Sequence, residues 1–172
     1  MTVHRKHLND DRTRGLVVAV VDEWVVLHEL IDGPYLDDVV FLRLDHVTKV
    51  RRHSSEDYLT RAMAGLGEPL AEFECVSDAT AGDLLRIVDA RAELVCVYGE
   101  TRKDYWLVLG KIHRIGRKRL DLHFIGRDGV WVDFLDAVKL KEITRIKYGG
   151  RYIQALERFG DAAPDAERRL KR

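Results

Sequence analysis

Cysteine, proline and serine are all scarce in this sequence of 172 residues, which contains two, three and three of them, respectively. Cys75 and Cys96 each stand in a short apolar run without a histidine pair nearby. We therefore expect small buried side chains rather than a disulfide framework or a zinc site. No apolar run approaches the roughly 18 residues that a membrane-spanning helix requires. Residues 1–12 are too polar for a secretion signal. These absences predict a cytoplasmic protein with no membrane partner.

The motifs of common catalytic sites are missing as well. The sequence has no Gly-x-Ser-x-Gly, no P-loop, no Gly-x-Gly-x-x-Gly and no His-Glu-x-x-His. Its serines are Ser54, Ser55 and Ser77, and the first two stand where a helix is expected to begin, so no nucleophile with a base can be named. We predict no catalytic residue, no cofactor and no metal ligand. An enzyme whose site lies between two halves of the chain is kept as a third hypothesis.

The most informative feature present is a stretch near residues 15–50 that reappears about 95 residues later. The matching pairs are Gly15 with Gly110, Leu27-His28 with Leu122-His123, Asp32-Gly33 with Asp128-Gly129, Leu44 with Leu140 and Thr48 with Thr144. Two copies of one supersecondary unit predict one small fold built twice. With 46% hydrophobic residues, the chain has enough apolar side chains for two modest cores. Because His28 and His123 recur together, we expect each to bond a loop backbone rather than a metal.

Turn signals recur about every ten residues between runs rich in Val, Ile, Trp and Phe, which predicts a mainly β fold. A polar segment at 4–8 is followed by a strand at 15–21 that is apolar enough to be buried on both faces. The further expected strands are 24–30, 39–44, 47–50, 93–99, 104–115, 119–126, 130–140 and 142–147, with a short one at 73–76. Apolar spacing and capping signals predict helices after Ser54, after Thr80 and over 152–159. The expected division is a first barrel with its C-terminal helix (1–66), a linker (67–79), a second barrel with a helix at each end (80–160) and a charged tail (161–172).

This order of elements resembles the Sm-like fold, a bent five-stranded barrel of the SH3 type, and the resemblance implies two such barrels in tandem. Most of residues 12–158 also resembles a family of uncharacterised bacterial proteins. The segments that carry this second likeness are Trp-Val-Val-Leu-His at 24–28, Ile-Thr-Arg-Ile at 143–146 and Gly-Gly-Arg-Tyr at 149–152. The first resemblance also implies rings formed through edge strands, a property that the duplication leaves open.

The residues with which Sm proteins bind uridine are not all matched. Asp22 stands at the position of the motif's Asp, but Val26 falls near the position of its Asn. In the second copy, Gly116 and Asp121 occupy the equivalent stretch, again without Asn. The basic residue and glycine of the second motif are replaced by Lys141-Glu142. The uridine pocket of that family is therefore not expected.

Charge is distributed unevenly although its sum is zero. Residues 1–100 contain 11 Lys and Arg against 19 Asp and Glu, whereas residues 101–151 contain 13 against 6. One interpretation is charge complementarity between the two copies or between protomers, and another is a basic face for nucleic acid on the second copy.

Basic side chains alternate with aromatic ones in this second copy, which is typical of surfaces that bind single-stranded nucleic acid. The candidate residues are Lys111, Arg114, Arg117, Lys118, Arg119, Arg145, Lys147, Arg151, Tyr105 and Trp106. A solvated strand face gives the same pattern. The sequence thus favours a non-catalytic interaction or scaffold module, with a protein partner or further copies of the chain as its partner. Binding of single-stranded RNA or DNA by the basic face is the alternative.

Overall fold

The computed structural model describes residues 1–5, 12–52, 56–67, 69–74, 77–100 and 105–164. In this part of the chain, ten strands form one open antiparallel sheet, so the prediction of a mainly β fold is confirmed. The strands are β1 (Thr2–Arg5), β2 (Arg12–Val21), β3 (Trp24–Ile31), β4 (Tyr35–Arg43), β5 (Val47–Arg51), β6 (Val95–Glu100), β7 (Tyr105–Ile115), β8 (Arg119–Ile125), β9 (Trp131–Lys139) and β10 (Arg145–Tyr148).

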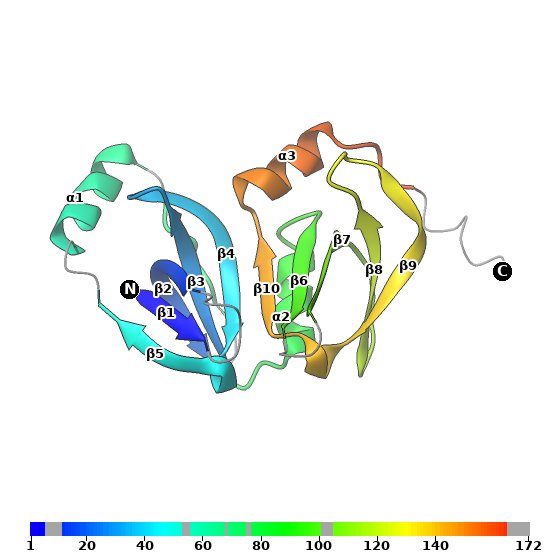
Figure 1. The fold of residues 1–172 in the computed structure, drawn as a ribbon, viewed down its shortest axis with the longest axis horizontal. Helices are drawn as coiled ribbons and strands as arrows, with labels where there is room; N and C mark the ends of the chain where they lie inside the picture. The colour runs from blue at the N-terminus through cyan, green and yellow to red at the C-terminus, as the bar shows by residue number, and fades with distance from the viewer. Residues whose placement is uncertain (6–11, 53–55, 68, 75–76, 101–104, 165–172) are drawn as a thin grey trace.

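The order of the strands across the sheet is β5-β1-β2-β3-β4-β10-β6-β7-β8-β9. Strands β1 to β5 form the first half and β6 to β10 the second, and in each half the last strand lies beside the first. The halves join where β4 pairs with β10, a pairing that we call the seam (Figure 1). In the seam, Lys147 lies opposite Val40 and Ile146 opposite Phe41.

Both faces of the sheet are covered near the seam. Trp24 and Val26 on β3 belong to a large core that includes the helix α2 (Ala81–Asp89) and residues of both halves. Val25 and Leu27 point to the other face and join a separate cluster of the first half. Successive strand residues point to opposite faces, so this unbroken apolar run is buried on both sides.

Local signals explain where α2 begins. Thr80 accepts a hydrogen bond from the Asp83 amide and the Asp83 carboxylate accepts one from the Thr80 amide, which is the capping box that the sequence predicts. Leu84, Leu85 and Val88 are buried in the large core, at the spacing of one helix face. The helix therefore ties both halves into one hydrophobic core.

Each of the two other α-helices packs on one half, α1 on a small cluster of the first half and α3 on a cluster of the second. Helix α1 (Glu56–Leu66) ends at Gly67, whose φ of 68° is the left-handed conformation that glycine adopts easily; its expected cap, Ser54, lies outside the described residues. Helix α3 (Arg151–Phe159) lies over the second half (Figure 1). The Gly150 and Arg151 amides at its start donate hydrogen bonds to the Asp38 and Asp37 carboxylates of the first half.

Several details differ from the sequence predictions. The N-terminal segment pairs with β2 and β5 as β1, although its polar residues gave no strand signal. Val20 is 65% exposed because β2 reaches the turn before β3 there, so β2 is not buried on both faces. Residues 73–74 lie outside the strands, and 75–76 outside the described residues. The expected strand at 142–147 begins later, because residues 140–142 form the short 3-10 helix η2 (Leu140–Glu142).

Among the described helices, none has the length and apolar character needed to cross a membrane.

Candidate functional site: a basic cavity between the halves

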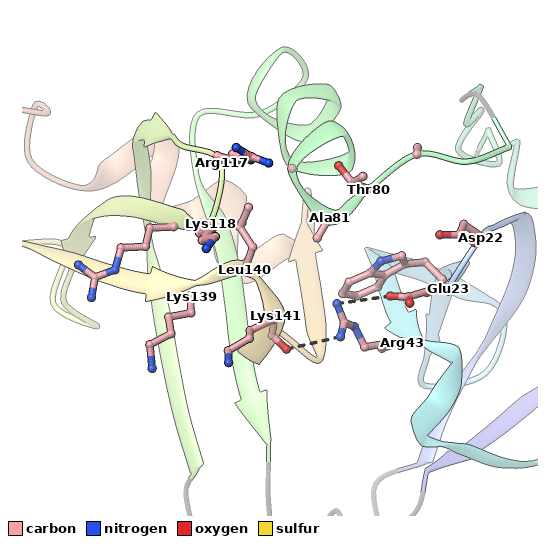
Figure 2. A pocket seen from close by; sticks show the side chains of 14 residues that line it. Asp22, Glu23, Arg43, Thr80, Ala81, Arg117, Lys118, Lys139, Leu140 and Lys141 are labelled. Carbon is pink, nitrogen blue, oxygen red and sulfur yellow. Dashed lines mark hydrogen bonds and ion pairs between the residues drawn. The ribbon is translucent and has the colours of Figure 1, made fainter.

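A cavity of about 820 Å³ opens where the two halves meet at one end of the seam. We call it the basic cavity (Figure 2). It lies among the turns β2–β3 and β7–β8, the end of β4, η2 and the start of α2. Its lining residues are Asp22, Glu23, Trp24, Arg43, Ala79, Thr80, Ala81, Gly82, Arg117, Lys118, Arg119, Lys139, Leu140 and Lys141. Six of them are cationic and two are anionic.

Arg43 holds the two sides of the basic cavity together. Its guanidinium lies 3.6 Å from the Glu23 carboxylate, donates a 3.4 Å hydrogen bond to the Lys141 carbonyl, and stacks 5.2 Å from the centroid of the Trp24 ring. Figure 2 shows the first two contacts as dashed lines. Arg43 was not among the sequence candidates. The sequence likeness between residues 15–50 and the stretch about 95 residues later was the signal that could have found it, because that alignment sets Arg43 against Lys139.

Most cations of the basic cavity are not neutralised. Lys139 is paired with Glu142 at 2.8 Å. Within the described residues, the side chains of Arg117, Lys118, Arg119 and Lys141 have no carboxylate partner, and all four are exposed. The amides at the start of α2 are already used by its capping box, so binding of an anion here would depend on these side chains.

The predicted aromatic residues lie elsewhere. Tyr105 and Trp106 begin β7, whereas Arg117 follows its far end, so the structure does not bring the rings and the basic turn together. The Trp106 ring covers Gly99: a Cβ on this glycine would lie 2.1 Å from the ring. Trp24, in the wall of the basic cavity, is only 1% exposed and offers no open ring face.

Arg145 and Lys147, predicted to form a basic face, are instead paired within the protein. Glu100 is buried and accepts bonds from Arg145 on β10 and, at 2.7 Å and 3.1 Å, from Arg5 on β1. Lys147 donates to Glu29 at 2.6 Å and to Asp38 at 3.1 Å. These contacts support charge complementarity between the halves.

The remaining candidates are also spread out. Arg114 is paired with Asp121 at 3.2 Å, and Lys111 lies exposed farther along β7. Arg151 begins α3 and stacks over Tyr35 at 5.6 Å. The structure therefore keeps Arg117, Lys118 and Arg119 in the basic cavity and adds Arg43, Lys139 and Lys141.

His28 and His123 both bond to backbone, but the prediction of a loop partner is confirmed only for His28, because Val132 lies on β9. His28 accepts a 3.0 Å hydrogen bond from the Ala71 amide, and the His123 Nε2 atom lies 2.8 Å from the Val132 carbonyl. No group of three or more His, Cys, Asp or Glu side chains in the described part of the chain is arranged to hold a metal ion.

Comparison with family models, curated proteins and solved structures found no match.

Proposed function

We propose that the chain is two tandem Sm-like barrels that act as a non-catalytic interaction module and assemble head to tail with further copies of the chain. The observation that carries the proposal is the strand order. Each half has its fifth strand beside its first, and the fourth strand of the first half pairs with the fifth of the second. Equivalent 3-10 helices, η1 (Leu44–His46) and η2, join the fourth and fifth strands in both halves.

The two outer edges of the sheet are equivalent to the two sides of the seam. Strand β5 corresponds to β10 and strand β9 to β4, and neither β5 nor β9 has a partner on its outer side among the described residues. Val50 on β5 is 53% exposed, whereas its equivalent in the seam, Ile146, is fully buried. Phe134 on β9 is 59% exposed. Unpaired strand edges with apolar side chains are templates for further pairing.

Charge favours the register of the seam at a junction between two copies, where β9 of one copy would pair with β5 of the next. The seam register, carried over to the outer edges, places Arg51 opposite Asp136 of the next copy. Burial raises the pKa of the Asp136 carboxyl, and no described cation is paired with it. At the same junction, the basic turn Arg117-Lys118 would meet the acidic turn Asp22-Glu23. A junction of this heterologous kind closes into a ring or continues as a filament, depending on its rotation.

Charge reversal tests this junction. We expect sedimentation velocity to show assembly that increases with protein concentration. Arg51→Glu should weaken association by about tenfold, because like charges would face each other across the edge strands. The double change Arg51→Glu with Asp136→Arg should restore it.

Arg61→Glu on α1 is the matched control, since it changes the net charge equally at an exposed position away from both edges. A chain that stays monomeric at every concentration would refute the assembly. Assembly that the double change does not restore would place the contact elsewhere.

A second candidate function, binding of single-stranded RNA or DNA through its phosphates, is favoured by the four unpaired cations of the basic cavity. Since the basic cavity has no open ring face, we expect binding that depends on salt and not on base identity. Fluorescence anisotropy with labelled oligouridylate and oligodeoxythymidylate across a salt series measures it. Arg117→Ala with Lys118→Ala should reduce the slope of log affinity against log salt by about 1.4, that is, two phosphate contacts at about 0.7 each.

The matched control for this test is Arg61→Ala with Arg158→Ala, which removes two exposed cations remote from the basic cavity. The control should leave the slope unchanged. If both double variants bind as the unchanged chain does, or if no binding is seen at low salt, the nucleic-acid proposal fails.

A further inference from the structure

A second cavity, of about 490 Å³, lies on the face of the sheet opposite α2, beneath the first turn of α3. We call it the α3 cavity. Its walls come from β4, β6, β7, β8 and β10 and from the helix itself. The lining residues are Asp38, Cys96, Tyr98, Leu107, Leu109, Phe124, Ile125, Arg127, Lys147, Tyr152 and Ile153. Its size and its mostly apolar lining are those of small-molecule sites.

The apolar part of the α3 cavity combines a fixed floor with an open rim. Leu109, Ile125 and Ile153 are buried in the cluster that packs α3 against the sheet, so they form a rigid floor. Leu107 is 38% exposed and Tyr152 is 54% exposed at the opening. Apolar surface is therefore uncovered in a concave site, where a ligand would shield it from water.

The polar end of the α3 cavity is already satisfied. Lys147 is held between Glu29 and Asp38, and these carboxylates outweigh the effect of burial and raise its pKa. Burial raises the pKa of the Cys96 thiol to about 11 and also raises the pKa of Tyr98, which hydrogen-bonds to it, so both groups stay neutral. The polar end thus has no charge free for a ligand.

One cation in the lining has no partner. Arg127 follows β8, is exposed, and is paired with no carboxylate in the described segments. We propose that the α3 cavity binds a small amphipathic monoanion, an aliphatic or aromatic acid, with its apolar body against Leu107, Leu109 and Phe124 and its acid group at Arg127. This site is independent of the assembly and of the basic cavity.

The test uses 8-anilinonaphthalene-1-sulfonate, an aromatic monoanion that fluoresces when its rings are shielded from water. We expect saturable binding of one probe per full-length chain and displacement of the probe by decanoate. Decyltrimethylammonium has the same apolar body with a cationic head, so it should displace the probe at least tenfold less well. Equal displacement by both compounds would overturn the proposal, because it would show no role for a cation.

Variants locate the binding. Arg127→Gln, at an exposed position, should weaken decanoate binding by about fivefold. Leu107→Trp should fill the opening and weaken it at least tenfold. The control Lys111→Gln removes an exposed cation from the same sheet, outside the α3 cavity, and should change nothing. If Arg127→Gln and Leu107→Trp both bind decanoate as the unchanged chain does, the site is not this cavity.

Discussion

Replacing Glu100 by glutamine will lower the free energy of unfolding by about 3–5 kcal/mol at neutral pH. The Glu100 side chain is 4% exposed and contacts both Arg5 and Arg145, so glutamine removes a buried negative charge that the two arginines share. Thr144 also donates a 2.8 Å hydrogen bond to this carboxylate. Urea denaturation followed by tryptophan fluorescence measures the loss.

Glu142→Gln is the control for this change. Its carboxylate is 44% exposed and paired with Lys139, so its removal should cost no more than about 0.5 kcal/mol. A loss below about 1 kcal/mol for Glu100→Gln would contradict the assigned role, because removing one partner of a buried ion pair costs more than that.

The effect of Glu100→Gln should depend on pH. Burial by itself raises the pKa of the Glu100 carboxyl, but the hydrogen bond from Arg5 and the charge of Arg145 outweigh it and hold the pKa below its usual 4.5. A carboxyl with a lowered folded-state pKa stabilises the fold above its unfolded pKa and loses that contribution as the pH falls through the folded value. The difference between the two chains should therefore be constant from pH 6 to pH 8 and shrink below about pH 4.5.

The positions of most strands could be predicted from the sequence, because an apolar run indicates by itself that its residues are buried. The run Trp24 to Leu27 is buried on both faces of β3, and the strand pattern at Leu120 and Leu122 has its inner side in the large core. The cap of α2 follows from Thr80 and Asp83, which are neighbours in the chain. Local chemistry was enough for these elements.

The partners of the charges could not be predicted in the same way. Lys147 alternates with Arg145 in a pattern that also suits a solvated face, and nothing near it in the sequence reveals Glu29 and Asp38. These residues are 118 and 109 positions away and come close only through the seam. Arg5, from a segment without a strand signal, reaches Glu100 for the same reason. The pairing of strands that are distant in the sequence therefore determines which cations form internal ion pairs and which remain exposed in the basic cavity.

Among glycine-to-alanine changes, Gly110→Ala should cause the largest loss in the free energy of unfolding. A Cβ on Gly110 would lie 1.9 Å from the His123 carbonyl oxygen and 2.7 Å from its carbon, so backbone and not a flexible side chain stands in the way. We expect a loss of about 4 kcal/mol or more in the free energy of unfolding, measured by urea denaturation, or failure to fold, seen by far-UV circular dichroism.

The equivalent glycine and a remote one provide the comparison. Gly15→Ala meets the His28 carbonyl oxygen at 2.6 Å, a milder clash at the same place in the first half, and should cost less than Gly110→Ala. Gly65→Ala has nothing within 4 Å and lies in α1, where alanine should stabilise the chain by about 0.5–1 kcal/mol. This ranking follows from how closely β7 and β8 approach, and β2 and β3 likewise, at one glycine in each half. Equal stability of all three variants would mean that the neighbouring strand can move away, and that these two glycines are not needed for the close approach.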